Sequence, residues 1–242
     1  MSDSESKGTP ALEPERREIV ALKQHVVAMS ELSVGMVADG TRALLTLDLE
    51  LARSVMARDV QLDRFDNDIE AETMHLIAQL QPEGQDLRTL GAVLKIANCV
   101  DRVGRLGYDI AQNLSQGAMV SDHGPDDLIA QMDVRARAMV RQAIDAFVRN
   151  DEALAKAVFA LDDDVDALNQ QVLQRAIELL TKGGGVTAER LAREILVGRH
   201  LERVADNACK IAEKAVYAIT GDRRSAYFPQ LAHKTPTGRV VP

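Results

Sequence analysis

The segment VDRVGRLGYDIAQ, residues 100–112, has a counterpart 101 positions further along the chain, LERVADNACKIAE, residues 201–213. A second pair of segments, DLELARSVMARDVQLD (48–63) and DEALAKAVFALDDDVD (151–166), aligns at an offset of 103. Two alignments at nearly the same offset predict one structural unit that occurs twice in the chain. We place the boundary between the two units near residues 120–125.

The composition predicts that this unit is helical. Aromatic residues make up only 3% of the chain, and the helix formers Ala, Leu, Glu, Arg and Gln are frequent. Only Pro82 and Pro125 interrupt the chain between residues 15 and 228, while Asp48 and Asp151 are placed to cap new helices. We therefore predict an all-α fold of two tandem three-helix bundles, with long helices at 12–46, 49–81, 85–118, 126–149, 152–182 and 187–220.

The predicted domain organisation follows from these helices and from the proline-rich ends. The chain divides into an N-terminal tail, a first bundle, a second bundle and a C-terminal tail, at residues 1–14, 15–120, 121–221 and 222–242. Long helices of this kind leave apolar stripes to cover, which favours a homodimer.

Charge and cysteine content exclude several classes of protein. The chain has 242 residues with 29 Lys+Arg and 37 Asp+Glu, a net charge of −8, which argues against nucleic acid as a partner. No run approaches 18 apolar residues, and the N-terminus lacks the apolar core of a secretory signal, so we expect neither membrane insertion nor secretion. Two isolated cysteines, Cys99 and Cys209, predict a reducing, cytoplasmic setting.

Carboxylates interrupt the apolar face of four predicted helices, two in each half, at Asp59, Asp101, Asp162 and Glu202. Three of them have a second carboxylate four residues later, which forms the pairs Asp59/Asp63, Asp162/Asp166 and Glu202/Asp206. Residues four apart lie on one face of a helix, so the two charges of a pair repel each other. Because a buried carboxylate costs several kcal/mol unless it is neutralised, each site needs protons, an arginine or metal ions.

Two facing helices with such pairs predict a cation site lined by oxygen atoms. The ligand set lacks Cys and His at matching spacing, so hard ions are favoured, namely Mg²⁺, Ca²⁺, Mn²⁺ or oxidised iron. In the first half, Arg105 follows Asp101 by four residues and could replace a metal outright. Two alternatives are a carboxylate-bridged metalloenzyme, for which only one ExxH motif (Glu72/His75) is present, and a metal-free helical adaptor with solvated acids.

The motifs resemble those of the PhoU family. Residues 86–112, DLRTLGAVLKIANCVDRVGRLGYDIAQ, resemble its "DLR…KIA…LERIGD…NIA" signature, and residues 191–213 resemble a second copy. The segments at 57–72 and 160–172 resemble the partner helix that carries the family's D-x-x-x-D. The resemblance covers most of residues 15–220. It implies a cytoplasmic, non-enzymatic accessory protein of the phosphate-specific transport system.

The resemblance also implies partners and cofactors. Members of the family restrain phosphate uptake and phosphate-starvation signalling through contacts with the ATPase subunit of the phosphate ABC transporter and with a membrane-bound sensor histidine kinase. Their acidic motifs hold multinuclear clusters of iron or zinc. Carried over, the ligands of the second site are Asp162, Asp166, Glu202 and Asp206, and those of the first are Asp59, Asp63 and Asp101. The family has Asp where this chain has Arg105, so we expect metal mainly in the second bundle.

Overall fold

The computed structural model describes residues 14–115, 126–182 and 188–222. These residues form seven helices and contain no strand, which confirms the all-α prediction for the described part of the chain. The predicted tails and the predicted boundary near residues 120–125 lie almost entirely outside the described residues. The helices are α1 (Pro14–Thr46), α2 (Leu49–Met56), α3 (Asp59–Leu80), α4 (Gly84–Ser115), α5 (Asp126–Arg149), α6 (Glu152–Lys182) and α7 (Ala188–Thr220).

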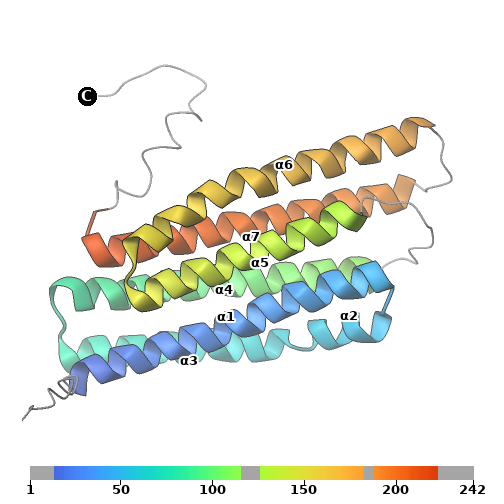
Figure 1. Cartoon of the computed structure of the whole chain (residues 1–242). Helices are drawn as coiled ribbons and strands as arrows, with labels where there is room; N and C mark the ends of the chain where they lie inside the picture. Colours follow the sequence, from blue (N-terminus) through green and yellow to red (C-terminus); the bar gives the residue numbers. More distant parts are fainter. Residues whose placement is uncertain (1–13, 116–125, 183–187, 223–242) are drawn as a thin grey trace, which may run out of the picture.

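The helices form two three-helix bundles that lie side by side (Figure 1). The first contains α1, the α2–α3 pair and α4, and the second contains α5, α6 and α7. Helices α4 and α7 pack against each other at the centre, α1 contacts α5 in front of them, and α3 and α6 lie at opposite edges. The buried apolar residues of both bundles join into one core. The prediction of two tandem bundles is confirmed. No helix in the described part of the chain is long and apolar enough to span a lipid bilayer.

The turn between the first two helices of each bundle is built in the same way in both halves. Leu47 and Asn150 adopt left-handed backbone conformations, with φ of 57° and 54°. The next residue is Asp48 or Asp151, and its N–H group bonds to a carbonyl five residues earlier at 2.9 Å in both halves. Each aspartate then accepts a hydrogen bond at 2.9 Å from the N–H group three residues later. Both predicted helix caps are confirmed.

One helix differs from the prediction. The helix expected at 49–81 is broken between Met56 and Asp59, so the prediction of a single long helix there was wrong. The N–H group of Arg58 bonds to the carbonyl of Val55, only three residues earlier, at 3.0 Å, and its guanidinium group pairs with Asp39 of α1 at 2.7 Å. The corresponding helix of the second bundle, α6, is unbroken.

Glycines bring α1 and α4 into backbone contact. A Cβ atom on Gly107 would lie 2.6 Å from backbone atoms of Met36 and Val37, and a Cβ on Gly40 would lie 2.7 Å from the carbonyl oxygen of Gly107. No other residue type fits there unless the helices separate. This contact fixes the rotation of α4, so that Arg105, two residues earlier, faces α3.

Candidate functional site

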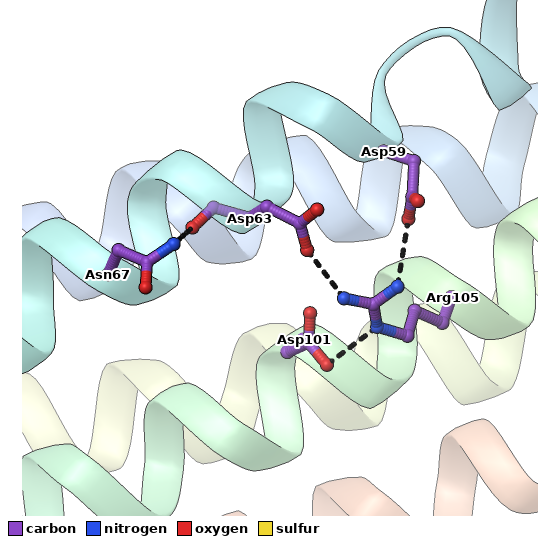
Figure 2. A network of polar contacts seen from close by, with 5 residues as sticks. All are labelled: Asp59, Asp63, Asn67, Asp101 and Arg105. Atoms are coloured by element: carbon purple, nitrogen blue, oxygen red, sulfur yellow. Dashed lines mark hydrogen bonds and ion pairs between the residues drawn. The ribbon is translucent and has the colours of Figure 1, made fainter.

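The first acidic cluster, between α3 and α4, consists of Asp59, Asp63 and Asp101 around Arg105 (Figure 2). The guanidinium group of Arg105 contacts all three carboxylates: Nε lies 2.9 Å from Asp101 Oδ2, Nη1 lies 3.3 Å from Asp59 Oδ1, and Nη2 lies 2.5 Å from Asp63 Oδ1. The structure therefore brings the three predicted residues together, with a cationic side chain of the protein at their centre.

Hydrogen bonding and charge hold this arginine in its ionised form. The pKa of Arg105 is raised, mainly by the hydrogen bond to Asp101, and further by Asp63 and Asp59, while burial opposes them. The neighbouring Asp66 has a raised pKa because of its burial, with the charge of Asp101 adding to it. Three carboxylate oxygens that face the centre already accept hydrogen bonds from Arg105, and a metal there would adjoin a like charge. The residues of the first acidic cluster, with Arg105 among them, do not fit a multinuclear metal cluster.

The second acidic cluster joins α6 to α7 and contains the four remaining predicted residues, Asp162, Asp166, Glu202 and Asp206. The side chain of Glu202 is 16% exposed. Its carboxylate accepts a hydrogen bond from Asn169 at 3.0 Å and forms an ion pair with Arg199. Arg199 lies on the same helix, three residues before Glu202, and its side chain is 59% exposed. Its pKa is raised mainly by the hydrogen bond to Glu202, with the charges of Asp206 and Asp166 adding.

The Cys209 thiol lies near the carboxylates of the second cluster. Burial raises its pKa far above the ordinary value, and the negative charges of Asp162, Asp206 and Asp166 raise it further. Of these three carboxylates, Asp162 also hydrogen-bonds the thiol. The sequence indicated that Cys209 packs on the helix seam, and the structure places it partly buried at the edge of this cluster.

The two clusters differ in how firmly the protein supplies a counter-charge. Within residues 14–115, 126–182 and 188–222, no three His, Cys, Asp or Glu side chains are arranged to hold a metal ion. Arg105 contacts three aspartates, whereas Arg199 pairs with Glu202 and is mostly exposed. The second cluster contains four carboxylates, which are the type of ligand that hard cations prefer.

Residues that the sequence marked less strongly lie elsewhere. Glu72 pairs with His25 of α1 at 2.6 Å, so the Glu72/His75 motif forms a contact between helices. His200 is half-buried in the seam between α4 and α7, where burial lowers its pKa and the charge of Asp109 opposes the shift. Neither histidine side chain belongs to an acidic cluster.

Sequence reasoning missed three residues of the two sites: Asn169, Arg199 and Asp66. Asn169 follows Asp166 by three residues and Arg199 precedes Glu202 by three, a spacing that places side chains on one helix face. A search one turn either side of each predicted ligand would have found both. Asp66 has the same relation to Asp63.

The fold and the clusters define a class of protein: an all-α chain of two tandem three-helix bundles, each with an acidic cluster between its second and third helices. The family model described as "PhoU domain" matches the chain twice, at residues 26–114 and 129–215. The chain belongs to the PhoU domain family.

Relatives and solved structures match over most of their length. The "Phosphate-specific transport system accessory protein PhoU homolog 1" of Thermotoga maritima is 30% identical over 215 residues, which cover 88% of this chain and 91% of the relative. A PhoU homolog of Caulobacter vibrioides is 30% identical over 221 residues, covering 88% of this chain and 93% of the relative. The crystal structure of PhoU from Pseudomonas aeruginosa superposes with a TM-score of 0.78 at 27% identity, covering 86% of this chain and 99% of that one.

Proposed function

We propose that this chain is a cytoplasmic regulatory protein of phosphate transport that restrains phosphate uptake and the phosphate-starvation response. The observation that carries the proposal is the match of both repeats to the PhoU domain, together with relatives named as accessory proteins of the phosphate-specific transport system. The protein acts without catalysis. Its helix faces contact the ATPase subunit of the phosphate ABC transporter and a membrane-bound sensor histidine kinase, and favour the inhibited state of each.

The second acidic cluster binds the metal ions in this proposal. Two carboxylates of α6 and two of α7 lie on helices that pack against each other, and Arg199 pairs with one of them from an exposed position. The oxygen ligands suit Mg²⁺, Mn²⁺, Ca²⁺ or oxidised iron, and the family resemblance favours iron or zinc. Bound metal would supply positive charge that links the two helices, so that the residues of the second bundle keep the shape that partners recognise.

Metal content per chain tests this assignment. We would measure it by mass spectrometry for the untagged protein and for two double variants with equal loss of charge. Glu202→Gln/Asp206→Asn should abolish bound metal, whereas Asp59→Asn/Asp63→Asn, in the cluster already neutralised by Arg105, should leave it unchanged. Equal metal in all three folded proteins would contradict the assignment to the second cluster. Absence of metal from the parent protein would instead support the metal-free helical adaptor.

The regulatory role is tested in the organism that carries this gene. Deleting it should raise phosphate uptake and the phosphate-starvation response in phosphate-rich medium, and the parent gene should restore both. Complementation by Glu202→Gln/Asp206→Asn then shows whether the second cluster is needed for regulation. Unchanged uptake and unchanged starvation response after deletion would refute the proposed function.

Dimerisation is supported by an apolar stripe on α6. Leu173, Ile177 and Leu180 are 46%, 48% and 48% exposed and recur every three or four residues, on one face of the helix. A second copy of the chain would cover this stripe. Light scattering should give a dimer for the parent protein and a monomer for Leu173→Lys/Ile177→Lys. The control is Val60→Lys, at an apolar position on α3 that is 60% exposed, and it should remain dimeric. A monomeric parent protein would refute this part of the proposal.

A further inference from the structure

A cavity of about 430 Å³ lies between the two bundles, where α4 begins and α7 ends. None of the residues that line it belongs to either acidic cluster. Its walls include three basic side chains, one carboxylate, one aromatic ring and one residue without a side chain: Arg88, Lys95, Lys214, Glu213, Tyr217 and Gly91. A volume of this size is typical of sites for small molecules.

The cavity carries excess positive charge in a protein whose net charge is −8. Its carboxylate, Glu213, pairs with Lys214 at 3.0 Å. Among the described residues, Lys95 makes no ion pair and no side-chain hydrogen bond, and Arg88 donates only to the carbonyl of Ala218, at 3.4 Å. Two positive charges are therefore left without a carboxylate partner, and like charges that converge on a cavity are stabilised by an anion.

The basic character continues along the seam beyond the cavity. Arg102 of α4 and Lys210 of α7 make no ion pair with the described residues. Their charges, with that of Lys214, reach the buried Cys99 thiol, where they oppose the burial that raises its pKa. Elsewhere many arginines pair with carboxylates, as Arg105 does with three of them. Two further basic side chains, one on α4 and one on α7, therefore lie close enough to the seam to add to its positive charge.

The shape of the cavity indicates what kind of anion fits. A Cβ atom on Gly91 would meet nothing within 4 Å, so the helix backbone is open to the cavity at this position. Tyr217 of α7 forms part of the wall, and an aromatic side chain can stack on the ring of a ligand. Arg88 donates a hydrogen bond to the carbonyl of Ala218, which offsets the negative end of the α7 helix dipole beside the cavity. The space is several times larger than a single oxyanion needs.

We propose that this cavity binds a nucleotide, with its phosphate groups against Arg88, Lys95 and Lys214 and its base against Tyr217. This site is separate from the acidic clusters and independent of the proposed role in phosphate transport. Because the cavity is formed by one helix from each bundle, a bound nucleotide would join the bundles at this end of the seam. The state of the protein would then depend on nucleotide binding as well as on metal binding.

Calorimetric titration of the full chain with ADP tests the proposal. The buffer contains EDTA, so that metal at the acidic clusters does not contribute. The decisive variant is Gly91→Glu, which places a carboxylate in open space inside the cavity, and its matched control is Gly91→Ala. We expect Gly91→Glu to weaken ADP binding by at least about tenfold and Gly91→Ala to change it less than about threefold. Unfolding temperatures check that both variants are folded.

Two further comparisons separate the phosphate and base contacts. Lys95→Gln should weaken the binding of ADP about tenfold. Lys182→Gln makes the same charge change at the end of α6 and should have little effect on this affinity. Tyr217→Leu should bring the affinity for ADP close to that for pyrophosphate. The proposal is overturned if ADP does not bind at about 1 mM, or if Gly91→Glu binds ADP as the parent protein does. Equal affinity of the parent protein for ADP and inorganic phosphate, or binding of an acidic peptide in place of ADP, would also overturn it.

Discussion

Replacing Arg105 with Gln removes the cation that lies at the centre of the first acidic cluster. Three contacts of 2.5, 2.9 and 3.3 Å are lost, and three carboxylates are left facing one another. The Arg105 side chain is 48% exposed, so water screens each pair to about 0.3–0.7 kcal/mol. Asp101 is only 14% exposed, so the loss of its partner adds about 1 kcal/mol. We expect Arg105→Gln to lower the free energy of unfolding by about 2–3 kcal/mol.

Urea unfolding followed by circular dichroism measures this difference. For a chain of this length the change corresponds to a fall of roughly 4–12 °C in the unfolding temperature. The control is Arg102→Gln, three residues earlier on α4, since Arg102 is exposed and makes no ion pair with the described residues. It should change the free energy of unfolding by less than about 0.5 kcal/mol.

The same variant should acquire a dependence on divalent cations. Without Arg105, the cluster presents three carboxylates and no counter-charge, so Mg²⁺ or Ca²⁺ should restore part of the lost stability. The measurement is made in the Glu202→Gln/Asp206→Asn background, so that the second cluster does not respond. If Arg105→Gln is as stable as Arg102→Gln and divalent cations leave its unfolding unchanged, then Arg105 is not the internal counter-ion of the cluster.

Three further outcomes follow from other parts of the structure. In urea unfolding, Gly107→Ala should lower the free energy of unfolding by at least about 3 kcal/mol, because its Cβ would lie 2.6 Å from backbone atoms of α1. Gly91→Ala has open space around its Cβ, so it should leave the free energy of unfolding unchanged or raise it by up to about 1 kcal/mol. Leu47→Asn should raise the free energy of unfolding by about 0.5–1 kcal/mol, because Leu47 is 47% exposed and has a left-handed backbone that Asn tolerates better. Burial lowers the pKa of Lys23 to about 8, with the charge of Asp86 opposing the shift. The unfolded chain therefore holds this proton up to a higher pH than the folded one, and stability should rise by roughly 2–3 kcal/mol from pH 8 to about pH 10.5, a rise that Lys23→Met should remove.

The sequence was informative about the helices because their signals are local. Apolar residues at spacings of three and four mark the buried faces, and Asp48 and Asp151 cap the next helix through hydrogen bonds to their own segment. The break after Met56 has no such signal, because neither proline nor glycine occurs there. It coincides with the ion pair between Arg58 and Asp39 of α1, a contact that depends on how two helices pack.

The acidic positions could be predicted because their spacing along the helix is also a local signal. The cationic side chains that contact them could not be predicted in this way. Helical spacing and the repeat alignment place the carboxylates on facing helices, which is where the structure has them. Which cation each carboxylate meets depends on the separation of the helices and on side-chain rotamers. Arg105 could be foreseen as a partner of Asp101 four residues away, but its reach to Asp59 and Asp63 across to α3 is a tertiary result.

The repeat explains why the two clusters should behave differently although their backbones correspond. At an offset of 101, Arg105 is the counterpart of Asp206, so a single position changes the local charge by two units. The first cluster contains its own cation, Arg105, so its carboxylates are partly neutralised without a bound ion. The second cluster has Asp206 at this position, and the arginine that pairs with its Glu202 is mostly exposed, so ions from solution can replace that cation more easily. A duplicated fold thus has one half with a fixed electrostatic state and one half whose state can respond to its surroundings.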